Sequence, residues 1–506
     1  MENLKNVKEY FNRIIKAQNF CQLAGTIITG SNGIFFSPVT DLTAKLYKST
    51  FDYFNSDQNS IRFLSSNGEG YIDVFITKRD HSEYLQMNFN MIDNLNIVKF
   101  SKFFFDSFFI ENIHITGMQG TADGLYTKTE ISQFCMDKKI GSDLILTAGP
   151  SISDLEKYYA LDAAENGWNN QWNGYLKRFE TDFAQYIGTK YAIATSSCTG
   201  ALHIALAALG IGPGDEVIVP DITWVATANA VLYVGAIPVF ADVSPTNWCI
   251  DPLSIEKLIT KRTKAIIPVH LYGHPAEMDV IMDLAKDYNL FVVEDAAPSI
   301  GAEYKGRRTG SFGHFAAFSF QGAKLAVTGE GGMLLTNDED LYKRAYTIWD
   351  QGRTPGTFWI ETNGLKYKMS NIQAAIGLAQ LERNDSMIEA KRRLFCWYKE
   401  NLENVSGIQI YSETPEAKSI YWMTSIILKD EAKITRDNMI KQLRIRNVDS
   451  RPVFPAISQY PIWPVKQDPQ PISKFVGERG INLPSGVCLS KAEVDYVCDQ
   501  IKAILK

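Results

Sequence analysis

Long apolar runs are missing from this chain. No stretch of about 18 apolar residues is free of charged residues, so the sequence predicts no membrane-spanning segment. The first residues, MENLKNVKEYFNRIIKAQ, are charged and amphipathic and lack the apolar core of a secretory signal. The cysteine usage of the chain fits a reducing cytoplasm, so we expect a cytoplasmic protein.

Cysteine and histidine are sparse and scattered. The seven cysteines are widely spaced and no two of them form CxxC, which argues against disulfides and against a structural zinc site. The six histidines include no HExxH pattern. His270 and His274 are four residues apart, but Gly273 interrupts any helix that would bring them onto one face. We therefore expect no metal site.

An excess of charge of one sign is also missing. The chain has 51 Lys and Arg against 57 Asp and Glu, a net charge of -6 over 506 residues. This balance argues against a nucleic-acid partner, although it leaves room for a local basic site. What the chain does have is length and 45% hydrophobic residues, enough for two or three packed units.

The first 138 residues form a block rich in Phe, Tyr, Asn and Ser. Segments with helical spacing are followed by segments with strand-like patterns. The helical ones are residues 7–15 and 41–51, and the strand-like ones are residues 71–76, 84–91 and 97–105. This order predicts an α+β accessory domain and resembles the SnoaL-like cone, which serves enzymes, binding pockets and dimerisation modules alike.

Residues 139–150 are expected to form a linker, after which short apolar strands alternate with helices. The expected strands are 191–195, 216–220, 238–241, 265–269, 290–294 and 315–320, and the expected helices include 201–209 and 224–234. This alternation predicts an α/β fold whose mainly parallel sheet is covered on both faces. The pattern loosens after about residue 390. We therefore expect a large domain over 151–390 and a small C-terminal α+β domain over 391–506.

Lys324 is the first candidate for chemistry. It lies in a loop after the apolar strand 315–320 and just before the glycine-rich run 329–332. A flat cofactor could reach an amine in such a loop, and partial burial would lower the pKa of the amine and make it a nucleophile. The alternative is a surface lysine in a turn.

Three further features lie at strand ends. Asp295 follows a buried strand and needs a cationic partner such as a protonated pyridine nitrogen; the alternative is a helix cap or a structural ion pair. The run 195–202, TSSCTGAL, leads into a helix whose N-terminus suits a phosphate. Trp224 also follows a strand and could stack on a planar ring or pack in the core. With Lys324 at the same edge of the sheet, these features describe a site for pyridoxal phosphate.

Residues 149–506 resemble the DegT-type sugar aminotransferases, a branch of the fold-type I pyridoxal-phosphate enzymes. The resemblance rests on ordered motifs, among them ALHIALAALGIGPGDEVIVPDITWVATANAV, VEDAAPSIGAEYKGRRTGSFG, AFSFQGAKLAVTGEGGMLLTND and YKMSNIQAAIGLAQLER. The nearest pattern is that of perosamine-synthase-like enzymes, which act on nucleotide-linked 4-keto-6-deoxy sugars. It implies a PLP-dependent transferase fold with a seven-stranded type of sheet, and amino transfer from L-glutamate.

The resemblance also implies roles for single residues. Lys324 would bond to the cofactor and carry the proton between Cα of the amino donor and C4′ of the cofactor. Asp295 would hold the pyridine nitrogen protonated, and Trp224 would stack on the ring. A dehydratase branch of the family has histidine in place of the lysine, so the presence of Lys324 favours transamination.

Other positions are implied to bind phosphate or sugar. The phosphate contacts would be Thr199, Gly200 and Ser319, and the nucleotide-sugar contacts would be Arg451 and Phe454. Lys366 stands where the family has an Asn that reaches the phosphate of a neighbouring subunit, which implies a homodimer or a larger homo-oligomer. Two more departures are Pro298, where a side chain often reaches the cofactor's phenolic oxygen, and Ser458, where a His is frequent.

Two alternatives remain open at this stage. A binding or regulatory protein could keep the fold without turnover, although the lysine, the acid and the aromatic residue are all present. A bifunctional enzyme could use residues 1–138 for an adjoining step. Asp73 and His81 are candidates there by residue type alone, and a solvated surface is the simpler interpretation.

Overall fold

The computed structural model describes residues 140–141 and 143–506, together with eight strands earlier in the chain. These strands are β1 (Ile28–Gly30), β2 (Gly33–Val39), β3 (Leu42–Leu46), β4 (Ser60–Ser65), β5 (Tyr71–Arg79), β6 (Ser82–Asn90), β7 (Asn112–Thr116) and β8 (Gly124–Thr127). They form one sheet in sequence order, in which β6 and β7 are parallel and the other neighbours antiparallel.

The expectations for this block have mixed outcomes. Strands β5 and β6 confirm the two expected near 71–76 and 84–91. The helix expected over 41–51 is wrong where β3 lies, because pairing with β2 and β4 overrides local helical spacing. The helix expected over 7–15, the strand over 97–105 and His81 lie outside the described residues, whereas Asp73 lies in β5. The resemblance to a SnoaL-like cone stays a prediction.

The chain divides into two compact units. The second unit comprises residues 140–150, 166–381 and 391–506, while residues 151–165 and 382–390 belong with the earlier part of the chain. In the second unit the expected linker is paired with the C-terminal region: Ile145 is buried and bridges to Val448, and Thr147 donates a hydrogen bond to Asp449 over 2.6 Å. The domain boundaries expected from the sequence stay a prediction.

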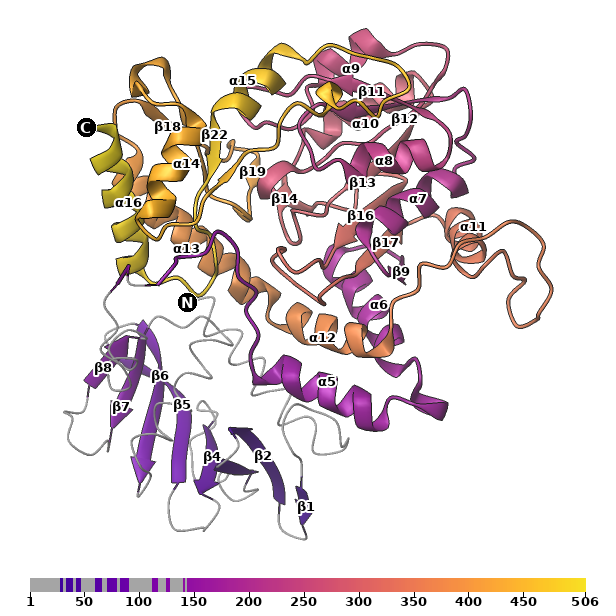
Figure 1. Ribbon diagram of the computed structural model, residues 1–506. Helices are drawn as coiled ribbons and strands as arrows, with labels where there is room; N and C mark the ends of the chain where they lie inside the picture. The colour runs from indigo at the N-terminus through magenta and orange to yellow at the C-terminus, as the bar shows by residue number, and fades with distance from the viewer. Residues whose placement is uncertain are drawn as a thin grey trace. The chain divides into compact units, whose positions relative to one another are not determined.

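A seven-stranded sheet forms the centre of the second unit (Figure 1). Its strands are β9 (Tyr191–Thr195), β10 (Glu216–Pro220), β11 (Ile237–Ala241), β12 (Thr263–Ile266), β13 (Phe291–Asp295), β16 (Phe315–Ser319) and β17 (Gly332–Thr336). They lie in the order β11-β10-β12-β13-β16-β17-β9. Only β17 runs against the others, so the prediction of a mainly parallel sheet is confirmed.

Helices flank this sheet and occupy much of the C-terminal region (Figure 1). These helices are α6 (Gly174–Ile187), α7 (Cys198–Ala208), α8 (Ala226–Tyr233), α9 (Pro252–Leu258), α10 (Met278–Asp287), α11 (Glu339–Trp349), α12 (Asn371–Glu382), α13 (Asn384–Leu402), α14 (Arg436–Ile445), α15 (Pro471–Arg479) and α16 (Lys491–Leu505), while α5 (Asp154–Asn166) belongs almost wholly to the first unit. In the described part of the chain, none of them is long and apolar enough to cross a bilayer.

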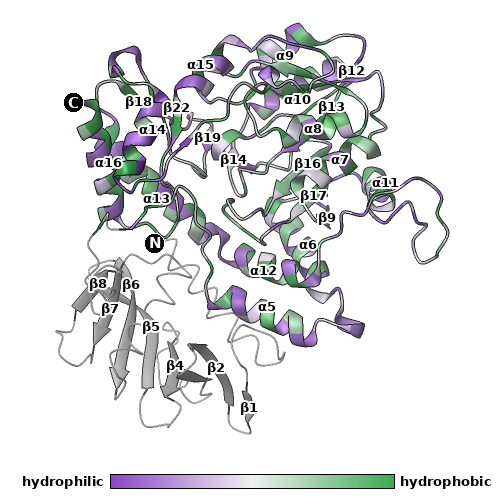
Figure 2. Ribbon diagram, in the orientation of Figure 1, coloured by the Kyte–Doolittle hydropathy of each residue, from purple (hydrophilic) through white to green (hydrophobic). Residues whose placement is uncertain are grey.

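The C-terminal region has a smaller sheet and its own core. Its four antiparallel strands lie in the order β18 (Ile408–Ile410), β20 (Ser425–Leu428), β22 (Gly480–Asn482) and β21 (Arg451–Pro452). A separate three-stranded antiparallel ribbon consists of β15 (Arg307–Arg308), β14 (Glu303–Tyr304) and β19 (Ala417–Lys418). Helix α16 carries both hydrophilic (purple) and hydrophobic (green) residues in Figure 2. Its buried residues Val494, Val497, Cys498 and Ile501 recur at helical spacing, which is how an outer helix packs one stripe on a core.

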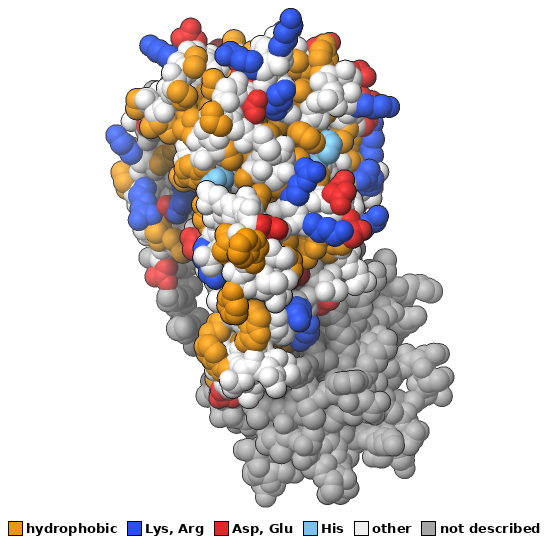
Figure 3. Space-filling model, turned by 90° about the vertical axis from the view of Figure 1, so that its right-hand side faces the viewer, with side chains coloured by type: hydrophobic (Ala, Val, Ile, Leu, Met, Phe, Trp, Pro, Cys, Tyr) orange, Lys and Arg blue, Asp and Glu red, His pale blue; other side chains and the backbone are white. Residues whose placement is uncertain are grey.

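A hairpin between α11 and α12 projects from the second unit (Figure 1). Its arms meet in antiparallel bridges between Asp350 and Lys366 and between Arg353 and Ile360, and we call residues 350–366 the projecting hairpin. The side chains of Phe358 and Trp359 near its tip are 95% and 73% exposed. Figure 3 views the molecule from this side and shows hydrophobic side chains on its surface. Such exposure of adjacent large aromatic residues is unusual on a free surface.

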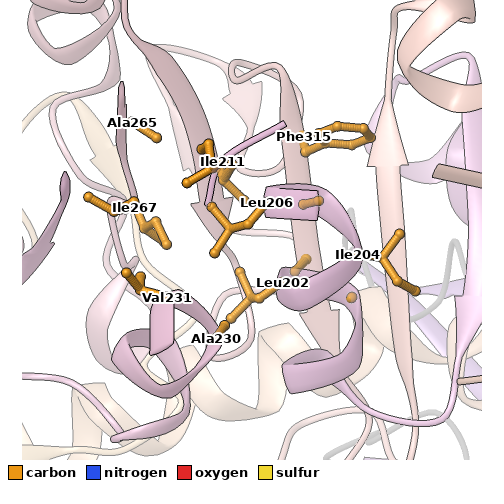
Figure 4. Packing of buried hydrophobic residues seen from close by; sticks show 14 of the residues in the cluster. Leu202, Ile204, Leu206, Ile211, Ala230, Val231, Ala265, Ile267 and Phe315 are labelled. Carbon is orange, nitrogen blue, oxygen red and sulfur yellow. The ribbon is translucent and has the colours of Figure 1, made fainter. Parts of the chain in front are cut away.

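The main core lies around helix α7, which is apolar on nearly every side. Leu202, Ile204 and Leu206 are completely buried among residues of the neighbouring strands and of α8 (Figure 4). The helix begins three residues before the expected position because Ser197 caps it, its side chain accepting a hydrogen bond from the Gly200 amide over 3.0 Å. This core fixes the start of α7 next to the ends of the central strands.

Candidate functional site

A cavity of about 500 Å³ lies where the parallel strands of the central sheet end. The segments after β9, β10, β13 and β16 reach it, because strands that run in one direction end at one edge of a sheet. Most of the residues singled out from the sequence line it: Thr199, Trp224, Asp295, Ser319, Lys324, Arg451 and Phe454. Side chains up to about 250 residues apart in the sequence thus share one concave site.

Gly200 and Lys366 are not part of the lining. The Gly200 amide already donates to Ser197, and a Cβ at Gly200 would lie 2.9 Å from the ring of Tyr367. Glycine at this position is therefore explained by the close approach of Tyr367. Lys366 is exposed in the returning arm of the projecting hairpin. The roles expected of both residues stay predictions.

Asp295 ends β13 with its carboxyl group buried. The hydroxyl of Thr227 donates to one carboxyl oxygen over 2.7 Å, and the amide of Ala297 donates to the other over 3.1 Å. A second hydroxyl, that of Thr223, lies 3.0 Å from the hydroxyl of Thr227. Burial raises the pKa of Asp295, while these hydrogen bonds and the nearby Lys324 amine favour the ionised form. This arrangement suits an ionised Asp295 that can pair with a cationic group of a ligand.

Lys324 lies in a tight loop after β16. The loop is closed by hydrogen bonds from the Gly322 amide to the Gly329 carbonyl and from the Lys324 amide to the Gln321 carbonyl, over 2.9 and 2.8 Å. Burial lowers the pKa of the Lys324 amine to about 8, although attraction by Asp295 opposes that change. A larger fraction of this amine than of an ordinary lysine is therefore neutral and nucleophilic near neutral pH.

Aromatic side chains also line the cavity. The indole of Trp224 is 61% exposed, and its ring centroid lies 5.9 Å from that of Phe454. Phe454 is held in turn by Tyr272, which stacks on it at 5.4 Å and accepts a hydrogen bond from its amide over 3.1 Å. The core-packing alternative for Trp224 is therefore wrong, because the ring faces the cavity with most of its surface uncovered.

The lining fits pyridoxal phosphate in its chemistry. Asp295 offers an anion for the pyridine nitrogen, Lys324 an amine for the aldehyde and Trp224 a flat apolar surface for the ring. The N-terminus of α7 and the hydroxyls of Thr199 and Ser319 offer donors for the phosphate. Each part of the cofactor thus has a matching group in one cavity.

Of the two departures from the family pattern at Pro298 and Ser458, only Pro298 lies in the cavity lining. Pro298 lines the cavity, so this part of the lining has no side chain that could form a hydrogen bond. Ser458 is buried and outside the lining, where its amide and hydroxyl donate to Asp221 over 2.8 and 3.0 Å. Ser458 therefore anchors its own segment to the end of β10.

Sequence reasoning missed three side chains that complete the site. Cys198 lies with its sulfur 4.0 Å from Asp295, Thr227 donates to Asp295, and the ring of Trp422 lies against Lys324. Cys198 and Thr227 stand inside the motifs TSSCTGAL and DITWVAT, whose polar side chains next to the strand ends are the signal for them. Trp422 stands in SIYWMTSI, which carries no signal of its own, because its contact depends on the folded C-terminal region.

Comparison with known proteins gives one consistent result. Residues 150–502 match the model of the DegT/DnrJ/EryC1/StrS aminotransferase family. The chain is 42% identical over 369 residues to a GDP-perosamine synthase of Caulobacter vibrioides, covering 72% of this chain and 100% of that protein. It is also 42% identical over 353 residues to a GDP-perosamine synthase of Escherichia coli O157:H7, covering 70% of this chain and 96% of that protein. The crystal structure of DesV from S. venezuelae superimposes with a TM-score of 0.65 at 32% identity, covering 69% of this chain and 94% of that one.

We predict that the rate at which added pyridoxal phosphate bonds to the ligand-free protein rises with pH and levels off above about pH 8. The neutral amine is the nucleophile, and the pKa of Lys324 is lowered to about 8. Stopped-flow visible absorbance over a series of pH values measures this rate. Lys324→Arg is the control, which should show no covalent absorbance, and a wild-type rate that is flat with pH would contradict the prediction.

We predict that Thr227→Val moves the acidic limb of the pH profile of pyridoxal phosphate binding to higher pH. The change removes a hydroxyl that stabilises the ionised Asp295, and a hydrogen bond to a charged group contributes about 1.5–3 kcal/mol, so the limb should move by about 1 to 2 pH units. Equilibrium titrations of the cofactor at a series of pH values give the profile. Thr227→Ser keeps the hydroxyl and should leave the limb in place; an unmoved limb in the valine variant refutes the assignment.

Proposed function

Because the chain belongs to the DegT/DnrJ/EryC1/StrS aminotransferase family, we propose that it moves an amino group from L-glutamate onto the keto carbon of a nucleotide-linked 4-keto-6-deoxy sugar. Pyridoxal 5′-phosphate is the cofactor of this family's sugar aminotransferases, and the lining of the cavity fits it. The product would be an aminosugar for a surface polysaccharide or a glycoside. The observation that carries the proposal is the meeting of Lys324, Asp295 and Trp224 in one cavity.

Lys324 and Asp295 are the proposed catalytic residues. Bound pyridoxal phosphate supplies an aldehyde that bonds reversibly to amines and a ring that takes up electrons from the neighbouring carbon. Asp295 keeps a proton on the ring nitrogen by presenting a carboxylate that Thr227 and Ala297 hold in place. Nζ of Lys324 takes the proton from the α-carbon of the amino donor, which its lowered pKa makes possible near neutral pH.

The remaining lining residues are proposed to orient the two substrates. Trp224 fixes the plane of the ring, while Thr199 and Ser319 contact the phosphate together with the N-terminus of α7. Arg451 and Phe454 come from the C-terminal region and face the same cavity, where a guanidinium and an aromatic ring suit the diphosphate and the sugar. Two relatives act on GDP-linked sugars according to their names, so GDP-linked 4-keto-6-deoxy sugars are the first acceptors to test.

A homodimer is the proposed working form. Among the described residues that line the cavity, the cationic ones are Lys324, which is assigned to the aldehyde, and Arg451, which is assigned to the nucleotide sugar. A phosphate dianion beside Thr199 needs a further positive charge. Lys366 lies in the projecting hairpin, whose exposed Phe358 and Trp359 need an apolar cover. A second copy of the chain would satisfy both needs if its hairpin reached this site.

The first 138 residues are proposed to be an accessory domain. The family match begins at residue 150, and the two perosamine synthases are covered over 96% and 100% of their own lengths by about seven-tenths of this chain. Amino transfer in those relatives therefore needs no counterpart of this block. The proposed division of the chain is an accessory domain over residues 1–138, a linker over 139–150, a large domain over 151–390 and a small domain over 391–506. The proposed location is the cytoplasm.

We predict that borohydride treatment of the protein loaded with pyridoxal phosphate attaches the cofactor to Lys324 and to no other lysine. L-Glutamate should change the visible absorbance of the wild type, while Lys324→Ala should lose this change and at least about 10³-fold of its activity, because nucleophile and proton carrier are removed together. Peptide mass spectrometry locates the label, and product formation from a GDP-linked keto sugar gives the rate. A label on another lysine, or a preserved spectral response in Lys324→Ala, rules out the assignment.

We predict that two inactive variants restore each other if sites are shared between subunits. Lys324→Ala lacks the nucleophile and Lys366→Ala lacks the charge for the partner's phosphate, so a mixed dimer contains one intact site. Random reassociation should recover about a quarter of the wild-type activity at limiting cofactor. Each variant reassociated with itself is the control. No recovery, in a mixture shown by sedimentation to contain mixed dimers, would exclude a shared site.

A further inference from the structure

Trp422 lies directly against the reactive lysine. It comes from the C-terminal region, between β19 and β20, is buried, and lines the same cavity as Lys324. Nζ of Lys324 is 3.8 Å from the centre of the indole ring. A charged amine at this distance over an aromatic face is attracted by the ring, most strongly where water is excluded.

The structure fixes Trp422 from several sides. Its indole Nε1 donates over 2.8 Å to the carbonyl of Ala323, the residue directly before Lys324. Its own carbonyl accepts a hydrogen bond from the buried amine of Lys391 over 2.7 Å. Tyr272 stacks on the ring with the centroids 5.9 Å apart and the planes 23° from parallel. The ring is therefore held in place by contacts within the protein itself.

The backbone also permits this approach only because of a glycine. Gly273 has a φ of +94°, and a Cβ at this position would lie 2.9 Å from the amide nitrogen of Trp422 and 2.6 Å from Ile420. The Ile420 amide donates to the carbonyl of Gly273 over 3.1 Å, which ties the two segments together. The close approach of the segment that carries Trp422 to the segment of Gly273 thus depends on glycine at this position.

We propose that Trp422 is a positioning residue for Lys324, whose ring holds the amine while it is not bonded to the cofactor and favours the charged form that the amine has once it has taken up a proton. This inference rests on the proposed function, because amino transfer frees the lysine while the nitrogen of a substrate occupies its place. A free lysine side chain can adopt many rotamers. Contact with the ring of Trp422 and attraction by the charge of Asp295 reduce the number of rotamers that Lys324 can adopt. The other titratable or charged side chains that line the cavity are Cys198, Glu330 and Arg451.

The test measures the pKa of Lys324 in the ligand-free protein. Trace acetylation at a series of pH values, read by mass spectrometry of the Lys324 peptide, gives this pKa without any turnover. Trp422→Phe and Trp422→Leu both lose the indole hydrogen bond, and they differ in whether a ring remains. We expect the pKa to be about 0.5 to 1 pH unit lower in the leucine variant, because only the phenylalanine ring still favours the charged amine.

Trp349 offers a matched control elsewhere in the same unit. Its indole donates to the Ala194 carbonyl over 3.0 Å, and its ring lies 4.2 Å from Nζ of Lys368, so it repeats the chemistry of Trp422 at another lysine. Trp349→Leu should leave the pKa of Lys324 where it is. Circular dichroism checks that each variant is folded, and Trp422→Met replaces the leucine variant if that variant does not fold.

The outcomes separate this inference from the proposed function. A lower pKa in Trp422→Leu or Trp422→Met than in Trp422→Phe, with borohydride labelling of Lys324 in the loaded wild type, supports the positioning role. Equal values, or a higher value without the ring, overturn the role of Trp422 and leave the proposed function standing if Lys324 is labelled. A loaded wild type that carries no label on Lys324 overturns the proposed function and this inference with it.

Discussion

A carboxylate and an amine that line one cavity, and whose pKa values are both shifted by burial, set the conditions for the rest of the site. Burial of Asp295 at the end of β13 would by itself favour its neutral form. The hydroxyl of Thr227, the amide of Ala297 and the charge of Lys324 oppose this effect. The negative charge of Asp295 in turn raises the pKa of Lys324 and so opposes the effect of burial. Each group therefore sets the protonation state in which the other can act.

Close approaches of the backbone hold these groups at working distance. A Cβ at Gly332 in β17 would lie 2.5 Å from the carbonyl carbon of Ser197, the residue that caps α7. The strand and the start of the helix are therefore in direct contact, which leaves Ser197 little room to move. Gly273 does the same for the segment that carries Trp422. The edge of the sheet and the C-terminal region are thus both fitted to one cavity by positions that admit no side chain.

The sequence allowed the central sheet and the main reactive groups to be predicted, because both depend on local signals. The strands are short apolar runs next to helices, and Asp295, Lys324 and Trp224 stand where such runs end. What could not be predicted depends on pairing between distant segments. The expected helix over 41–51 fails at β3, since its neighbours in the sheet decide its conformation. Trp422 was missed because its role follows from a contact that appears only in the folded chain.

The pairing of β9 has a consequence for how the protein is made. This strand comes first in the central sheet along the chain, but it lies at the edge, where its neighbour in the sheet is β17, some 140 residues later. A growing chain therefore leaves the ribosome with β9 unpaired until residues 332–336 have emerged. During that time its apolar edge is exposed to aggregation and to chaperones. The native sheet should therefore form late in synthesis, since its first strand can pair in the sheet only after its last strand has been made.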